Sequence, residues 1–229
     1  LSIAWESSRR GLSVVVLDQA LPGREASWAG AGILPPGHPA SPLSRLSSVS
    51  TELWPRWSAD LREATGIENG YRRCGGLRFP ESPEDDIEAE MVGWRAAGID
   101  ARILNGTEIQ DCEPAVSGDR FEMACRLPAL AQVRNPRHLK ALISACAGRD
   151  VEIRCGHAVV GWRESRSRVT AAVTPGGEVC GDQFVVACGA WSPQVLGERS
   201  GPIAIEPIRG QIVLLATDHA LFGHVLACG

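Results

Sequence analysis

The sequence predicts a mixed α/β fold that combines a parallel helix–strand unit with antiparallel strands. Its first 18 residues run in the order helix, glycine turn, apolar strand and acid, which is typical of parallel α/β units. Residues 151–187 alternate between strand-like runs and strong turn sequences. Between these regions lie segments with helix caps and helical periodicity. We therefore expect several helices and more than one sheet.

Residues 1–10 predict a helix with one apolar face. Arginines at its end suit the negative end of the helix dipole, and Gly11 suits the left-handed residue that follows a helix. Residues 12–18 form a β-branched apolar run that closes on an acid, which predicts a parallel strand buried on both faces. The predicted helix face consists of Leu1, Ala4, Trp5 and Ser8.

This order matches the second half of a dinucleotide-binding βαβ unit. In the complete unit a G-x-G-x-x-G turn opens the helix, and an acid about 20 residues later accepts hydrogen bonds from ribose hydroxyls. Asp18 stands where that acid belongs, with 17 residues before it. We therefore expect the glycine turn to end just before Leu1, outside this chain. The alternative is an ordinary helix–strand pair in which Asp18 is only a strand-end residue.

An uncharged run of small residues follows at 26–34. Small residues let the backbone approach a flat ligand, and backbone N–H groups there can bind phosphate or ring acceptors. The alternative is a flexible linker, but Trp28, Ile33 and Leu34 argue against one.

Periodicity and cap signals predict four further helices. Residues 42–65 form the longest, with Trp54 and Trp57 on one side and a break or kink at Pro55. Serine, proline and two acids open the next helix, which ends before a glycine, and a capping-box pattern opens a short one. An Asn-Pro pair opens the last. These three helices are predicted at residues 82–97, from 107–110 onwards, and at 135–147.

Turn residues divide the second half of the chain into strands. A serine-rich turn at 165–167 and a Pro-Gly-Gly turn at 175–177 predict antiparallel hairpins. The apolar run before Gly189 predicts a buried strand that ends where the backbone could approach a ligand. The predicted strands are residues 151–155, 157–163, 168–174, 184–187 and 211–215.

Composition and charge exclude several classes of protein. The chain is 44% hydrophobic and carries a formal net charge of −4, which gives no electrostatic case for nucleic acid or an anionic membrane. No apolar run approaches the roughly 20 residues that span a bilayer, and we expect no signal peptide. Eight cysteines without a C-x-x-C pair predict neither a metal site nor a disulfide framework, so we expect small buried thiols and a cytosolic protein.

Four segments together resemble the D-amino-acid oxidase superfamily of flavoproteins, and within it the glycine oxidase branch associated with thiamine biosynthesis. They fall in the order and at the spacing of that family, and they cover nearly the whole chain. They are residues 27–34 (S-W-A-G-A-G-I-L, after L-D at 17–18), 74–78 (C-G-G-L-R), 185–192 (V-V-A-C-G-A-W-S) and 207–211 (P-I-R-G-Q).

The resemblance implies an FAD-binding Rossmann-like domain with an inserted antiparallel-sheet substrate domain, incomplete at both ends relative to full-length members. It implies an FAD-binding domain from residues 1–41 and 135–203. It places the first part of the substrate domain at 42–134 and the start of a return to that domain at 204–229.

The same resemblance implies an FAD cofactor and the residues that contact it. It also implies that the substrate carboxylate is held by a late arginine outside this chain, so neither Arg78 nor Arg209 is assigned that role. We assign no catalytic residue, no role to Glu25 or His38, and we expect His138 to be an exposed residue of a helix start. The predicted FAD contacts are Asp18, Ser27, Ala29, Gly30, Gly32, Ile33, Leu34, Val159, Cys188, Gly189 and Trp191.

The reaction implied by the family is oxidation of the C–N bond of glycine or another small amino acid or amine, with oxygen as acceptor. A sarcosine or D-amino-acid oxidase, or a dehydrogenase, is the nearby alternative. A non-catalytic nucleotide-binding remnant is the alternative of another class. We expect a small-molecule substrate, no nucleic acid or membrane partner, and an oligomeric state that leaves a homo-oligomer open.

Overall fold

The computed structural model describes residues 1–37, 43–82, 84–117, 120–201 and 203–228. The chain forms two compact units. Unit 1 consists of Leu1–Ala29 with Leu142–Val213, and unit 2 consists of Gly30–Ala141 with Leu214–Gly229. The assignment of cofactor and substrate domains stays a prediction, because compactness alone does not show what a unit binds.

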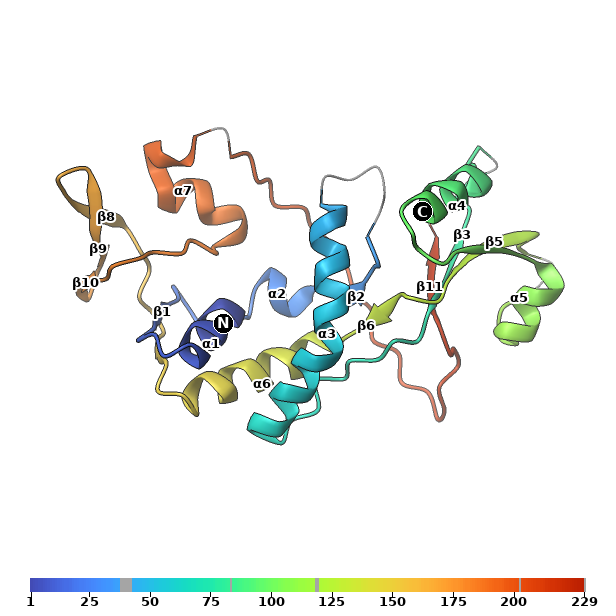
Figure 1. Cartoon of the computed structure of the whole chain (residues 1–229), viewed down its shortest axis with the longest axis horizontal. Coiled ribbons are helices and arrows are strands. Elements are labelled where there is room, and N and C mark those ends of the chain that lie inside the picture. The colour runs from blue at the N-terminus through green and yellow to red at the C-terminus, as the bar shows by residue number, and fades with distance from the viewer. Residues whose placement is uncertain (38–42, 83, 118–119, 202, 229) are drawn as a thin grey trace. The chain divides into compact units, whose positions relative to one another are not determined.

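Unit 1 contains a parallel strand pair and a separate three-stranded sheet (Figure 1). The chain enters it a second time through α6 (Asn135–Ala147), which crosses the border between the units. Its helices are α1 (Ser2–Arg9), α2 (Ala26–Ala29) and α7 (Ser192–Leu196), with 3-10 turns at Gly189–Trp191 and Gly197–Ser200. Its strands are β1 (Val15–Leu17), β7 (Glu152–Arg154), β8 (Gly161–Ser165), β9 (Arg168–Thr174) and β10 (Gly177–Cys180).

The predicted helix, glycine turn and parallel strand at the start of the chain are confirmed. Helix α1 buries Ala4, Trp5 and Ser8, Gly11 follows it at φ +81°, and β1 pairs in parallel with β7. The expected burial of β1 on both faces is wrong. Val15 is 37% exposed, because β1 has only β7 as a neighbouring strand within the described part of the chain.

The antiparallel hairpins of unit 1 are also confirmed. Strands β8 and β9 meet at Arg166 and Ser167, which both have positive φ, as the twist of a two-residue hairpin turn requires. Strand β10 then pairs with β9. Trp162 on β8 donates its indole N–H to the Val195 carbonyl at 2.7 Å and packs edge-on against Phe184, which attaches α7 to the sheet.

Two predicted strands are wrong. Residues 184–187 and 211–215 are not in strand conformation, and Val185 and Leu214 are 63% and 83% exposed. Apolar β-branched runs form strands only where a neighbouring strand takes up their backbone N–H and C=O groups. Neither run has such a neighbour among the described residues.

Unit 2 is built on a four-stranded sheet in the order β11-β3-β5-β4, in which only the β11–β3 pair is parallel. Side chains alternate across it, so that Ala124 faces the α5 side and Cys125 the α4 side. Both faces therefore carry a helix (Figure 1). The elements are β2 (Ile33–Leu34), α3 (Ser44–Thr65), β3 (Gly76–Phe79), α4 (Ile87–Ala96), β4 (Arg102–Asn105), α5 (Gly106–Cys112), β5 (Met123–Leu127), β6 (Ala131–Gln132) and β11 (Val225–Cys228).

The long helix α3 is confirmed, and it is not broken at Pro55. Its axis changes direction partway along (Figure 1), as a missing backbone N–H inside a helix allows. Trp54 and Trp57 do lie on one side, edge to face with ring centres 5.7 Å apart. The predicted start at Pro42 lies outside the described residues.

Two helix starts differ from the prediction. Helix α4 begins at Ile87 behind the cap Asp86, because Asp85 instead accepts backbone N–H groups of the preceding turn at residues 81–82. Pro83 lies outside the described residues. Helix α5 does have a capping box, but Asn105 and Glu108 form it, whereas we expected Thr107 to begin it. An asparagine one residue before a glycine was the overlooked cap.

A buried carboxylate attaches the end of the chain to unit 2. Glu113, the C-cap of α5, is 1% exposed and accepts N–H groups from Gly223 at 2.8 Å and His224 at 2.6 Å. The His224 ring nitrogen Nδ1 also lies 2.6 Å from the carboxylate. Strand β11 begins at the next residue, so Glu113 holds its entry against β3.

We predict that Glu113→Gln destabilises unit 2 by about 1–3 kcal/mol, because the amide NH₂ would face N–H donors in a buried site. Urea unfolding followed by tryptophan fluorescence measures the change. Glu178→Gln, which removes an exposed partner of Arg163, is the matched control and should leave the midpoint unchanged. Equal effects of the two substitutions would contradict this role for Glu113.

Candidate functional site

Asp18 lies at the carboxyl ends of the parallel strands of unit 1. Its backbone N–H donates to the Arg154 carbonyl at 3.1 Å, and its own carbonyl accepts the His157 N–H at 2.8 Å. The carboxylate accepts the Ala20 N–H at 2.9 Å. A carboxylate offers about four lone-pair sites, so this single bond leaves capacity for a ligand hydroxyl.

One loop of unit 1 contacts Asp18, and a second lies within range of its charge. The first contains His157 and, two residues on, the half-buried Val159. The second contains Cys188. The pKa of its thiol is raised chiefly by desolvation, although the residue as a whole is exposed, and the Asp18 charge raises it further. The structure therefore places the loop before Val159 in hydrogen-bond contact with Asp18, and Cys188 within range of the Asp18 charge.

The second loop presents open backbone and apolar side chains. Gly189 has φ +55°, and a Cβ added there would meet nothing within 4 Å. Val185 and Trp191 in this loop are 63% and 43% exposed, and Val160 in the first loop is 67% exposed. An acceptor for ribose hydroxyls beside accessible apolar surface suits the adenosine part of FAD.

The remaining predicted contacts fall on the small-residue loop. Ser27 and Ala29 lie on α2 in unit 1 and are exposed, whereas residues 30–34 belong to unit 2. Gly32 has φ +73°, and a Cβ there would lie 2.0 Å from the Val133 carbonyl oxygen. Only glycine fits this position. The predicted contacts are thus two groups, one within each unit.

The residues present fit FAD in part. The acid, the glycines and the exposed apolar side chains match an adenosine moiety and a flat ring approached by backbone. Within unit 1, Asp18 could accept hydrogen bonds from a ribose. Within unit 2, the backbone at Gly30 and Gly32 could be approached closely by a flat ring. The sequence contains no G-x-G-x-x-G turn, so no residue of this chain is assigned to the pyrophosphate.

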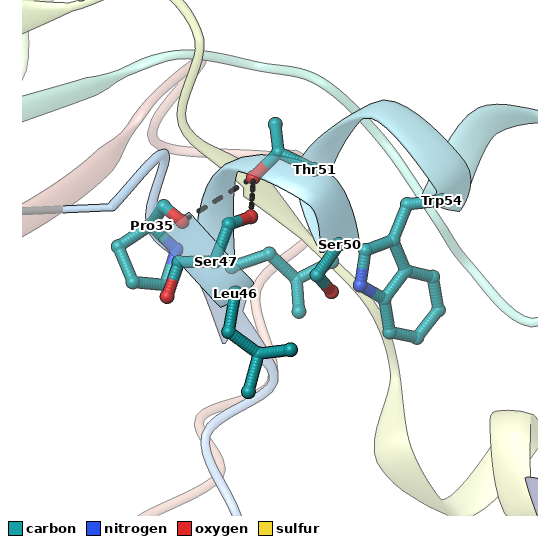
Figure 2. A pocket seen from close by; sticks show the side chains of 7 residues that line it. Pro35, Leu46, Ser47, Ser50, Thr51 and Trp54 are labelled. Carbon is teal, nitrogen blue, oxygen red and sulfur yellow. Dashed lines mark hydrogen bonds between the residues drawn. The ribbon is translucent and has the colours of Figure 1, made fainter. Parts of the chain in front are cut away.

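A small hollow of about 270 Å³ opens beside the end of the same loop, between β2 and α3 (Figure 2). Thr51 donates its hydroxyl to the Ser47 carbonyl at 2.9 Å along one wall. The described residues that line it carry hydroxyl groups and apolar surface and include no titratable side chain. Its lining consists of Leu34, Pro35, Leu46, Ser47, Ser50, Thr51 and Trp54.

His138 is buried, and the expected exposure is wrong. The residue is 9% exposed. The centre of its ring lies 5.0 Å from that of Trp54 and 5.3 Å from that of Trp57. The Asn69 amide nitrogen lies 3.3 Å from Nδ1, which makes Nδ1 the acceptor and Nε2 the protonated nitrogen. Desolvation lowers the pKa of His138 to about 4. The two tryptophans of α3 were a sign of an aromatic cluster, but no sequence signal linked them to α6.

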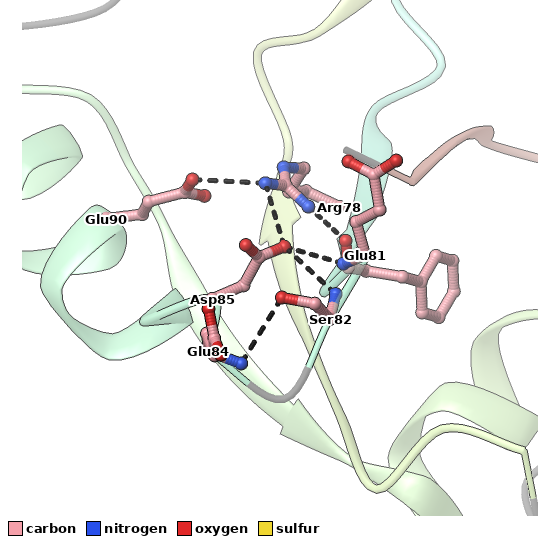
Figure 3. A network of polar contacts seen from close by, with 7 residues as sticks. Arg78, Glu81, Ser82, Glu84, Asp85 and Glu90 are labelled. Carbon is pink, nitrogen blue, oxygen red and sulfur yellow. Dashed lines mark hydrogen bonds and ion pairs between the residues drawn. The ribbon is translucent and has the colours of Figure 1, made fainter.

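The arginines and acids without an assigned role are also placed by the structure. Arg78 pairs with Glu90 at 3.1 Å and Asp85 at 3.8 Å (Figure 3), so it joins β3 to α4 and is not available to a substrate carboxylate. Arg209 and Glu25 are exposed. His38 lies outside the described residues.

All eight cysteines are free thiols. The expectation that they are buried holds for Cys125 and Cys146, and desolvation raises the pKa of Cys125 to about 11. It is wrong for four exposed cysteines, because they lie on strand ends and loops. These are Cys155, Cys180, Cys188 and Cys228. No group of metal-ligating side chains occurs among the residues that the structure describes.

None of the described helices has the length and apolar character needed to cross a membrane.

Comparisons with known proteins agree with this fold. The FAD dependent oxidoreductase (DAO) family model matches residues 1–226. The chain is 32% identical over 223 residues to glycine oxidase of Pseudomonas putida, which covers 94% of this chain and 60% of that protein. It is 28% identical to the bifunctional protein ThiO/ThiG of Trichormus variabilis, over 93% of this chain and 32% of that protein.

The crystal structure of glycine oxidase from Geobacillus kaustophilus matches with a TM-score of 0.86 at 25% identity. The match covers 99% of this chain and 62% of that one. This chain therefore belongs to the FAD dependent oxidoreductase family, and the predicted fold class and resemblance are confirmed. It spans about 60% of the length of the glycine oxidase relative.

Burial of His138 makes the stability of the chain depend on pH. Its folded-state pKa of about 4 lies below the unfolded value of 6.5, so its contribution is complete above pH 6.5 and is lost as pH falls toward 4. We predict a loss of roughly 3 kcal/mol between pH 7 and pH 4. Urea unfolding across this range measures it.

The substitution His138→Gln should flatten this pH dependence, because glutamine does not titrate. His219→Gln, at an exposed position, is the control and should keep the original slope. A slope that is unchanged in His138→Gln would show that other groups produce it.

Proposed function

We propose that this chain is part of an FAD-dependent amino-acid oxidase. Its substrate would be glycine or another small amino acid, whose C–N bond is oxidised to an imine. The family match and the identity to glycine oxidase support this. In the structure, one observation carries it: Asp18 ends a parallel strand beside the loops of Val159 and Cys188, where a ribose and an adenine could lie.

When bound, FAD supplies the acceptor for the hydride that leaves the substrate α-carbon. The amino nitrogen gives up a proton, and water hydrolyses the resulting imine to an oxo acid and ammonia. The overall reaction would thus convert the amino acid, oxygen and water to an oxo acid, ammonia and hydrogen peroxide. This chemistry needs no acid–base dyad, and the described residues near the proposed site provide none that we can assign.

The proposed roles of the two units follow from their sheets. Residues 1–41 and 135–203 would bind FAD, and residues 42–134 and 204–229 would belong to the substrate domain. The parallel pair β1–β7 supports the first assignment, and the antiparallel strands β3, β5 and β4 support the second. The compact units alternate in the same order, with borders at Ala29, Ala141 and Val213.

We expect this chain by itself to bind FAD weakly or not at all and to show no turnover. The parallel sheet has two strands, and residues 203–215 expose many apolar side chains. The chain also spans only part of its relatives. A cytosolic location and a homo-oligomer remain predictions.

Two alternatives remain. A sarcosine oxidase, D-amino-acid oxidase or dehydrogenase would bind FAD in the same way, and its substrate and electron acceptor would distinguish it. Hydrogen peroxide from glycine, measured on the whole protein that contains this chain, favours the oxidase. A non-catalytic nucleotide-binding protein would bind the cofactor or its adenosine part and give no substrate-dependent reduction.

We predict that Asp18→Asn weakens FAD binding roughly tenfold or more, because a hydrogen bond from ribose to a charged acceptor is lost. Quenching of FAD fluorescence on titration with the chain measures this. Asp182→Asn, at an exposed loop position of the same unit, is the matched control and should bind like the unchanged chain. Equal affinities for all three proteins would contradict the assignment of Asp18.

A further inference from the structure

Asn135 contacts the glycine loop from a distant part of the sequence. It is the first residue of α6, and its Nδ2 donates to the Gly30 carbonyl at 3.0 Å. Its Oδ1 would lie 3.1 Å from a Cβ placed on Gly32. The whole side-chain amide therefore lies against residues 30–32, within unit 2.

A second hydrogen bond orients the Gly32–Ile33 peptide in the same direction as the Gly30–Ala31 peptide. The Val133 N–H donates to the Gly32 carbonyl at 2.8 Å, in register with the β2–β6 pairing of Ile33 with Gln132. The carbonyl groups of Gly30 and Gly32 are thus both directed toward the segment that ends at Asn135.

The opposite side of the loop then presents N–H groups. In a trans peptide the C=O and the following N–H point in opposite directions, and the described chain contains no cis peptide. The Ala31 N–H is therefore directed away from Asn135. Antiparallel alternation also turns the Ile33 N–H away from β6, since Gly32 and Val133 form the hydrogen-bonded pair.

Only one of these two donors is fixed by strand pairing. Ile33 belongs to β2, whereas the Gly30–Ala31 peptide lies before the strand. Glycine has no Cβ to restrict rotation of that peptide. The bond from Asn135 to the Gly30 carbonyl is the described contact that sets its orientation.

We propose that Asn135 is a positioning residue for the cofactor. Its amide orients the Gly30–Ala31 peptide so that the Ala31 N–H joins the Ile33 N–H as a pair of donors to acceptor atoms of FAD. This inference rests on the proposed function. It requires a donor at position 135, which aspartate and alanine both lack.

Carbonyl-labelled glycine and ¹⁵N-labelled alanine test the orientation directly. The sequence contains two Gly-Ala pairs, 30–31 and 189–190, so a carbonyl-to-amide NMR spectrum shows two signals. Asn135→Asp and Asn135→Ala should both shift the 30–31 signal and leave the 189–190 signal in place. Asn105→Asp is the matched control at another helix start, because there the side-chain oxygen only accepts.

The same proteins are then titrated with FAD. The unchanged chain and Asn105→Asp should show a shift of the 30–31 signal on binding, and both Asn135 variants should bind about tenfold more weakly. Equal affinity for Asn135→Ala and the unchanged chain would overturn the inference while leaving the proposed function intact. So would weakening by Asn135→Asp alone, since that points to the added charge. Absence of FAD binding by the whole protein that contains this chain would contradict the proposed function itself.

Discussion

The close crossing of two backbones at Gly32 is the constraint on which the candidate site depends. The Val133 carbonyl occupies the space where any other residue would carry its Cβ. The contact joins the start of β2 to the segment between β6 and α6, and so connects the small-residue loop to a strand and a helix start. A loop made of glycine and alanine gains a defined backbone conformation from its neighbours, because its own side chains supply none.

The parallel strand pair β1–β7 of unit 1 positions Asp18. Its carboxyl ends are the place where ligands bind in open α/β sheets, and Asp18 places a carboxylate there. Strand β7 contacts Asp18 through its backbone and not through a side chain. It fixes the position of Asp18 through the backbone, and the loop that follows it returns to the Asp18 carbonyl. A short strand pair is enough to define the site, even though it leaves β1 partly exposed.

Local signals were sufficient to predict most of the fold. Glycine turns, hairpin turns and helical periodicity depend on neighbouring residues, and the elements that they predicted at α1, α3, α6 and β7 to β9 are present. The strands expected at 184–187 and 211–215 failed because strand formation depends on a partner, which no local pattern reports. Helix starts failed where several capping residues competed, as at Asp85 and Asp86.

The site was predicted less completely than the fold. Asp18 and the glycine loop could be recognised because both follow a strand pattern and contain unusual residue types. Asn135 and the burial of His138 could not, since each depends on a contact between helices or loops distant in the sequence. The proposed chemistry rests on the family match, because the cofactor would carry out hydride transfer and this part of the chain needs no distinctive catalytic residues for it.

Amide hydrogen exchange with and without FAD tests the central claim most directly. The account predicts slower exchange on FAD addition in three segments, residues 26–34, 156–160 and 185–191, with no change in the hairpins of β8 to β10. Protection confined to other segments, or none at FAD concentrations that saturate binding, would contradict the assignment of these segments as FAD contacts.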